Sequence, residues 1–184
     1  VESVRCAVCP KGKKKHYAYK TTIGFDPDNY TCVGCAAGYW SDSNADKCIR
    51  CPKGFYSNLT EAKSCQVCEA GRYNPNEASS ETMNVSCLEC MAGRYSSAKG
   101  VTRSDDCNKC AAGKKNPHEG ATLSTNCTEC AVDTFSEATG SSSCDACFSG
   151  RTAVVGSVRC AVCPKGTKKQ SDYETVESES DNYT

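Results

Sequence analysis

The sequence is poor in the side chains that build a hydrophobic core. Leu, Ile, Val and Phe together account for only 22 of the 184 residues. A chain with under roughly 20% of these residues normally stays disordered, because it buries too little apolar surface to offset the entropy of ordering. The sequence therefore excludes a large domain that is stabilised by apolar burial alone.

Other absences from the sequence exclude further classes of protein. No apolar stretch approaches the roughly 18 residues of a membrane span, and the N-terminus has no apolar signal core, so we expect a mature or internal fragment. The 22 basic and 22 acidic residues cancel, which gives no drive toward nucleic acid or an anionic membrane. His16 and His118 lie in polar stretches without a nearby nucleophile, so we expect no enzymatic activity and no cofactor.

Cysteine is what the sequence has in excess. Eighteen cysteines in 184 residues are typical of a disulfide scaffold, which requires an oxidising compartment and predicts an extracellular or cell-surface location. The cysteines form nine Cys-x-x-Cys pairs that start 16 to 26 residues apart, which indicates a repeat array. The pairs are Cys6/Cys9, Cys32/Cys35, Cys48/Cys51, Cys65/Cys68, Cys87/Cys90, Cys107/Cys110, Cys127/Cys130, Cys144/Cys147 and Cys160/Cys163.

The residues after each pair also repeat. The third residue after the second cysteine is glycine in every case but Asp133, which predicts a tight turn with positive φ. An aromatic residue often comes two places later, where we expect it to pack on the neighbouring disulfide, and a Ser or Asn usually follows it. We therefore predict a small disulfide-rich fold: an elongated tandem array of short irregular β-hairpin modules with little helix and no large core. The aromatic positions are Trp40, Tyr56, Tyr73, Tyr95 and Phe135.

A longer period overlies the short one. Residues 3–12 return identically as residues 157–166, and residues 28–31 return as residues 181–184. We interpret residues 1–31 as a module with a long basic loop, residues 32–159 as tandem Cys-x-x-Cys modules, and residues 160–184 as the start of the next copy.

Paired cysteines have other uses. Two pairs about 15 to 20 residues apart also fit a four-cysteine zinc ribbon, although nine is an odd number of pairs. A thioredoxin-type redox site would need a helix opening at the pair, and no window has helical periodicity. Asp26 and Asp28 lack the glycine and distal glutamate of an EF-hand calcium loop, so a plain turn is favoured there.

The motif Cys-x-x-Cys-Pro-x-Gly-x-Tyr-Ser, at residues 48–57, resembles the ephrin-receptor-like cysteine-rich repeats. It is also similar to the first half-module of tumour-necrosis-factor-receptor repeats and to growth-factor-receptor cysteine-rich domains, and serial arrays of this kind resemble protist surface antigens. The extra cysteines that complete a tumour-necrosis-factor-receptor module are missing, so the resemblance does not extend to cytokine binding.

The resemblance implies serial disulfides, in which the second cysteine of each pair joins the first cysteine of the next. Cys6 and Cys163 are left over, and we expect them to bond to cysteines of neighbouring segments. The implied bridges are Cys9–Cys32, Cys35–Cys48, Cys51–Cys65, Cys68–Cys87, Cys90–Cys107, Cys110–Cys127, Cys130–Cys144 and Cys147–Cys160.

The expected partners are other extracellular proteins or further copies of this chain, together with N-linked glycans. A basic stretch, Lys11 to Lys20, and an acidic stretch, Asp172 to Asp181, follow equivalent cysteines, so the two could meet between neighbouring arrays; two solvated loops are the alternative. We expect a structural or adhesive protein of a coat, spacer or filament; the alternatives are a receptor-type ectodomain and, more remotely, a zinc-binding scaffold. The sequons that predict glycans are Asn29, Asn58, Asn84, Asn126 and Asn182.

Overall fold

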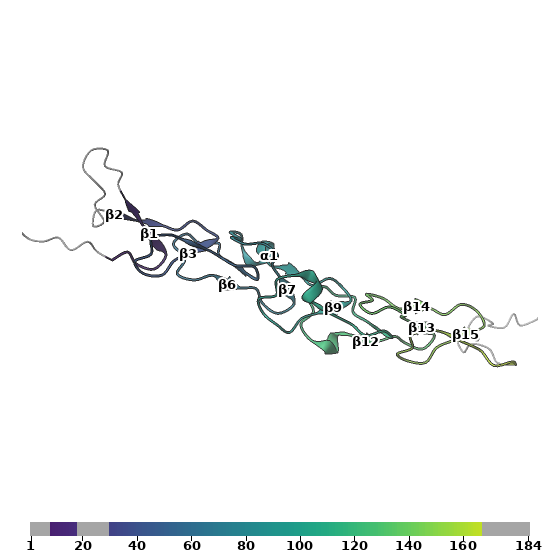
Figure 1. Ribbon diagram of the computed structural model, residues 1–184. Coiled ribbons are helices and arrows are strands. Elements are labelled where there is room, and N and C mark those ends of the chain that lie inside the picture. Colours follow the sequence, from purple (N-terminus) through teal and green to yellow (C-terminus); the bar gives the residue numbers. More distant parts are fainter. Residues whose placement is uncertain (1–7, 18–29, 167–184) are drawn as a thin grey trace, which may run out of the picture. The chain divides into compact units, whose positions relative to one another are not determined.

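The computed structural model describes residues 8–17 and 30–166. Within these residues the chain forms a succession of two-stranded antiparallel hairpins, coloured in chain order in Figure 1. Most strands are two residues long, because one strand of each hairpin directly follows the turn position and the other consists of the two residues between the cysteines of the next pair. The first hairpin is the exception, since five residues of β1 pair with five residues of β2.

The strands are β1 (Lys13–Tyr17), β2 (Tyr30–Gly34), β3 (Tyr39–Trp40), β4 (Ile49–Arg50), β5 (Phe55–Tyr56), β6 (Gln66–Val67), β7 (Arg72–Tyr73), β8 (Leu88–Glu89), β9 (Arg94–Tyr95), β10 (Asn108–Lys109), β11 (Lys114–Lys115), β12 (Thr128–Glu129), β13 (Thr134–Phe135), β14 (Asp145–Ala146), β15 (Arg151–Thr152) and β16 (Ala161–Val162). Each odd-numbered strand pairs with the even-numbered strand that follows it. Helix is confined to single turns, α1 (Met83–Ser86), η1 (Ser104–Asp106) and η2 (Ser124–Asn126), in the described part of the chain.

Disulfides close the hairpins one after another. Eight bridges connect the second cysteine of a pair to the first cysteine of the next, the serial pairing that the resemblance implies. We number the closed loops as modules 1 to 8, from Cys9–Cys32 to Cys147–Cys160. Cys163 carries a half-buried free thiol, and Cys6 lies outside the described residues.

The chain divides into two compact units. The described residues of the first unit are 8–17, 30–91, 96–107 and 120–122, and those of the second are 92–95, 108–119 and 123–166. The boundary runs through modules 5 and 6, so the compact units do not follow the module boundaries.

The buried positions are mostly cysteines. The second cysteine of each pair from Cys9 to Cys147 is buried, whereas among the repeating aromatic residues only Tyr56 is. Tyr56 of module 3 forms a small cluster with Cys68 and Cys87 of module 4, on which Met83 of α1 packs. The expectation that the aromatic residue packs on the neighbouring disulfide is confirmed at Tyr56. Its equivalents Trp40, Tyr73, Tyr95 and Phe135 are half-buried.

The predicted glycine turn is present in every described module. The eight turn glycines have φ between 76° and 87°, and Asp133 takes the same turn with φ 62°. Asp133 is held there by the next module, since the Thr152 hydroxyl donates a hydrogen bond of 2.8 Å to its carboxylate.

The turn glycines also allow a close approach between next-but-one modules. A Cβ atom built on Gly93 of module 5 would lie 1.9 Å from the carbonyl oxygen of Gly140 in module 7. Similar approaches within the same compact unit recur at Gly12, Gly38, Gly54, Gly71 and Gly113. A side chain at these positions would displace backbone from two modules away, so the glycines are required by packing as well as by φ.

We predict that Gly93→Ala destabilises the folded chain more than Gly150→Ala. Both glycines have positive φ, but a Cβ at Gly150 meets nothing within 4 Å. Gly150→Ala should cost about 1 to 2 kcal/mol for its backbone conformation, and Gly93→Ala about 1 to 3 kcal/mol more for the overlap. Denaturant unfolding with intact disulfides measures both, and equal losses would contradict the close approach.

Candidate functional site

The junctions between successive modules are the most regular feature of the structure. At each junction, the amide at the turn position and the amide three residues later donate to carbonyls of the next module, and an amide of the next module donates back to a cysteine carbonyl. Between modules 3 and 4 these bonds are Gly54 to Asn74 (2.9 Å), Ser57 to Ser79 (3.0 Å) and Ala78 to Cys51 (2.8 Å). Between modules 6 and 7 they are Gly113 to Ser136 (2.8 Å), Asn116 to Ser141 (3.1 Å) and Gly140 to Cys110 (2.8 Å).

A buried polar side chain lies at the centre of six of the seven junctions, and the buried Ala153 takes this place between modules 7 and 8. Ser41, Ser57, Asn74, Ser96, Asn116 and Ser136 are all buried, although they are small and polar. We call this set the junction residues. The sequence pattern contained them, as the Ser or Asn after the aromatic position, but only the structure shows that they lie inside the array.

Asn74 shows how a junction residue links two modules. Its side-chain amide donates to the Phe55 carbonyl of the preceding module at 2.9 Å and to the Ser79 hydroxyl at 2.9 Å, while its side-chain oxygen accepts from the Asn76 amide at 3.0 Å. Asn116 repeats the arrangement with the Arg94 carbonyl at 3.1 Å. Every buried side-chain nitrogen or oxygen atom in the described residues has a partner, which is the condition for a stabilising polar core.

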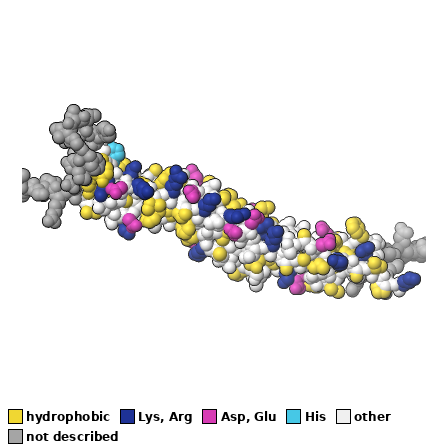
Figure 2. Space-filling model, in the orientation of Figure 1, with side chains coloured by type: hydrophobic (Ala, Val, Ile, Leu, Met, Phe, Trp, Pro, Cys, Tyr) yellow, Lys and Arg dark blue, Asp and Glu magenta, His cyan; other side chains and the backbone are white. Residues whose placement is uncertain are grey.

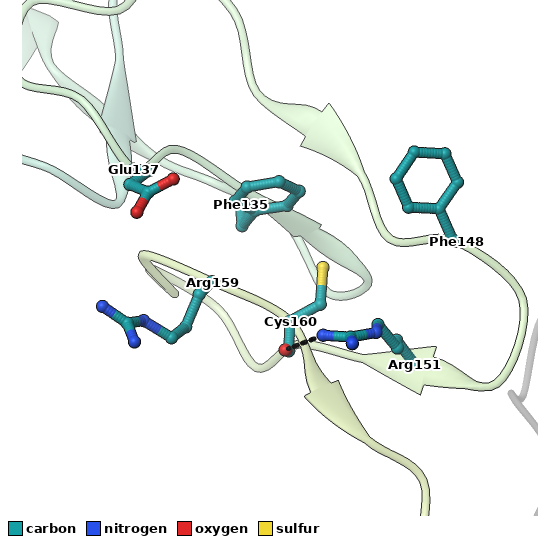
Figure 3. Close-up of a pocket in the computed structure, with 6 residues that line it drawn as sticks. All are labelled: Phe135, Glu137, Phe148, Arg151, Arg159 and Cys160. Atoms are coloured by element: carbon teal, nitrogen blue, oxygen red, sulfur yellow. Dashed lines mark hydrogen bonds between the residues drawn. The ribbon is translucent and has the colours of Figure 1, made fainter.

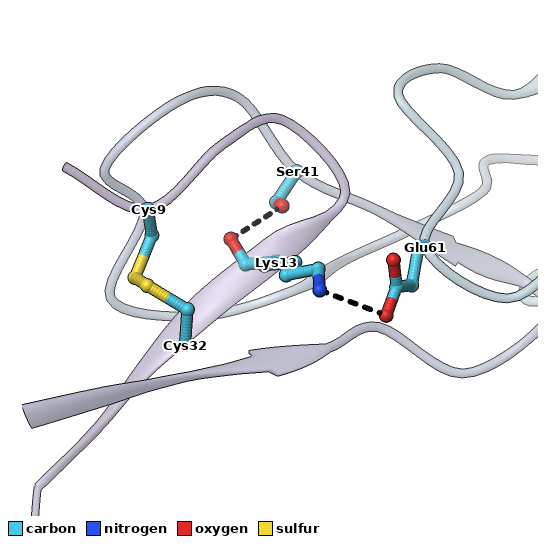
Figure 4. Close-up of polar contacts among 5 residues, drawn as sticks. All are labelled: Cys9, Lys13, Cys32, Ser41 and Glu61. Atoms are coloured by element: carbon cyan, nitrogen blue, oxygen red, sulfur yellow. Dashed lines mark hydrogen bonds and ion pairs between the residues drawn. A yellow bond between two sulfur atoms is a disulfide. The ribbon is translucent and has the colours of Figure 1, made fainter. Parts of the chain in front are cut away.

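An ion pair lies beside the first junction, between modules 1 and 2. The Ser41 hydroxyl donates to the Lys13 carbonyl at 2.9 Å, and the Lys13 ammonium lies 3.2 Å from Glu61 of module 3 (Figure 4). The Cys9–Cys32 disulfide closes the module from which Lys13 extends.

Other lysines of the basic stretch are paired as well. Lys11 lies 3.1 Å from Asp42, and Lys15 lies 3.5 Å from Asp46 with its ammonium over the Tyr30 ring. Desolvation, and the hydrogen bond that it donates to Asp46, raise the pKa of Tyr17. These pairs lie within the chain, which weakens the electrostatic argument that this stretch binds the acidic stretch of a neighbour; Lys20 and residues 172–181 lie outside the described residues.

The sequons in the described residues lie at the surface. Asn58 follows β5, Asn84 lies on α1, and both are exposed. Asn126 is exposed too, but its side-chain oxygen accepts a hydrogen bond from the Leu123 amide at 2.9 Å and the next residue is disulfide-bonded. Asn29 and Asn182 lie outside the described residues, as do Asp26 and Asp28. His16 and His118 are exposed.

A pocket of about 430 Å³ lies on modules 7 and 8 of the second unit. Phe135 of β13 and Phe148 form its aromatic walls, and Arg151, Arg159 and Glu137 surround them (Figure 3). The Arg151 guanidinium donates to the Cys160 carbonyl at 3.4 Å. Elsewhere, the face shown in Figure 2 has basic and acidic side chains interspersed, without a large patch of one sign.

None of the helices within residues 8–17 and 30–166 is long and apolar enough to cross a membrane. In the same ranges, no three His, Cys, Asp or Glu side chains gather where they could hold a metal ion.

Serial disulfides, paired short hairpins and repeated junctions define an array of cysteine-rich repeats of the extracellular type. Residues 38–84 match the family model described as tyrosine-protein kinase ephrin type A/B receptor-like. This segment spans modules 2 and 3 and most of module 4, and it includes the motif at residues 48–57 on which the resemblance was based.

Curated relatives share parts of the same pattern. The chain is 31% identical over 77 residues to the signal peptide, CUB and EGF-like domain-containing protein 2 of Mus musculus, an alignment that covers 41% of this chain and 8% of that protein. It is 28% identical over 110 residues to laminin subunit gamma-2 of Equus caballus, covering 49% of this chain and 9% of that protein. The chain thus spans less than a tenth of either relative, and the similarity is one of cysteine-rich modules.

We predict that Asn74→Ala destabilises the chain by about 1 to 3 kcal/mol, because it leaves the half-buried Phe55 carbonyl without its side-chain donor. Asn74→Ser should cost less, since serine is the junction residue of modules 2, 3, 5 and 7. The exposed Asn76→Ala is the control and should change stability by less than about 0.5 kcal/mol. Denaturant midpoints under non-reducing conditions measure all three; a neutral Asn74→Ala would contradict the role of this residue.

Proposed function

We propose that this protein is a structural or adhesive component outside the cell, in a surface coat, spacer or filament. The observation that carries the proposal is the junction, because the recurring residues of each module serve to bind that module to its neighbours. Cysteines close the loops, turn glycines permit close approach, and the junction residues donate across modules. Because the recurring residues close the loops and bind neighbouring modules, they favour a load-bearing or spacing role over catalysis.

An extracellular location is the part of the proposal that the chemistry favours most strongly. Eight disulfides persist in an oxidising compartment and would be reduced in a cytosol. The matched family model and the laminin relative carry modules of this type. We propose Asn58 and Asn84 as acceptors of N-linked glycans, because both side chains are exposed.

A receptor-type ectodomain is the second candidate, favoured by the match of residues 38–84 to a receptor-like model. The two candidate functions predict different copy numbers of the protein and different resistance to extraction. A coat or filament component should be present in many copies and resist extraction, whereas a receptor should be sparse and released by mild detergent.

We expect antibodies raised against the oxidised chain to label intact, unpermeabilised cells of the source organism. We also expect release by detergent to need a reducing agent, because Cys163 and Cys6 are predicted to bond to neighbouring segments. Labelling that appears only after permeabilisation would overturn the extracellular assignment. Complete release by mild detergent alone, from a sparse surface population, would decide for the receptor.

A further inference from the structure

Module 8 carries apolar side chains at positions that are exposed to solvent in other modules as well. Phe148 is 81% exposed, and the residue at the same place in module 5, Met91, is 60% exposed although further modules follow it. The exposure of Phe148 is therefore a property of the position. Val154 and Val155 occupy places that hold the exposed Ala138 and Thr139 in module 7. Module 8 thus offers an apolar surface that array packing does not explain.

The same module carries uncompensated positive charge. Residues 148–165 contain Arg151, Arg159 and Lys165 but no Asp or Glu. Neither arginine has an ion pair among the described residues, in contrast to Arg72, which pairs with Glu89. Glu137 is the one acidic residue that lines the pocket.

The pocket combines two kinds of recognition. Phe135 and Phe148 offer aromatic faces for a ring or an aliphatic side chain, and the two guanidinium groups can each bind a carboxylate in a bidentate manner. The volume of about 430 Å³ is in the range of pockets that bind a few side chains. A fitting ligand is an acidic peptide with an aromatic residue next to a carboxylate.

The chain itself contains such a segment. Residues 170–184 include five acidic residues and no basic one, and Tyr173 stands between Asp172 and Glu174. This charge and residue order complement the pocket, whereas Lys11, Lys13 and Lys15 of the basic stretch are already paired within the chain.

We propose that the pocket on modules 7 and 8 binds the acidic segment 172–181 of a second copy of the chain. Each copy then offers one pocket and one segment, so the contact is heterologous and propagates from copy to copy. A propagating contact would assemble copies into a coat or filament. In this respect the inference rests on the proposed structural function. Self-association should weaken as salt rises toward about 1 M, where the Debye length is about 3 Å.

The test uses the oxidised chain of residues 1–184 with Cys6 and Cys163 alkylated, so that disulfide exchange does not link copies. One variant, Arg151→Glu with Arg159→Glu, loses the pocket charge; a second, Asp172→Asn with Glu174→Gln and Glu177→Gln, loses the segment charge. We expect sedimentation velocity to show at least about tenfold weaker self-association for each variant alone. The two variants mixed should associate, because one keeps the segment and the other keeps the pocket.

Matched controls separate the pocket from general effects of charge and hydrophobicity. Arg50→Glu with Arg103→Glu makes the same charge change at exposed arginines outside the pocket and should leave association unchanged. Phe148→Ala should weaken association, whereas Met91→Ala at the equivalent position should not.

Three results would overturn the proposal. Wild-type association equal to that of the pocket variant would exclude the pocket, and a mixture of the two variants that stays monomeric would exclude contact between copies. If the wild type is monomeric while a synthetic peptide of residues 170–181 binds the segment variant, the segment binds its own chain. In all three cases, unchanged surface labelling of cells would leave the proposed extracellular role standing.

Discussion

The disulfide that joins one cysteine pair to the next is the constraint on which the rest of this structure depends. The closed loops bury little apolar surface apart from their cysteines, and the apolar cluster in the described residues is small: Tyr56 of module 3 with Cys68 and Cys87 of module 4. Closing a loop of about 15 residues removes on the order of 3 kcal/mol of unfolded-chain entropy in the standard model. The loops close over 13 to 23 residues here, so cross-linking can replace much of the stabilisation that a core would supply.

Once the loops are closed, backbone groups make most of the contacts between modules. The amide at the turn position, the amide three residues later and the carbonyl of a cysteine can make these bonds whatever the surface side chains of a module. The exposed side chains are therefore left for other uses. Module 8 illustrates this freedom, because its junction contacts to module 7 coexist with an apolar and basic surface around Phe148 and Arg151.

Much of this architecture could be predicted from local spacing. The cysteine pairs gave the number of modules, and the glycine three residues after each pair predicted a turn whose positive φ is confirmed at Gly54 and its equivalents. The fold class of small disulfide-rich hairpin modules with little helix is confirmed as well. These features depend on residues a few places apart, which a single sequence displays directly.

The remaining features depend on contacts between distant residues. Ser41 was visible as a repeated small polar residue, but its burial results from the Lys13 carbonyl of the preceding module. The pairing of Lys13 with Glu61 joins residues 48 positions apart, so the lysine run appeared free in the sequence. The pocket was missed for the same reason, since Phe135 and Arg159 come from different modules and neither is unusual in its own repeat.

Peptide mapping of the oxidised protein tests the central claim most directly. After proteolysis without reduction, mass spectrometry should find cross-linked peptides that join successive pairs, such as Cys68 with Cys87 and Cys110 with Cys127. Reduction should then separate each of them into two peptides. Bridges within a pair, such as Cys65 with Cys68, or cysteines that are released as free thiols when a chelator is added, would contradict an array of serially closed modules.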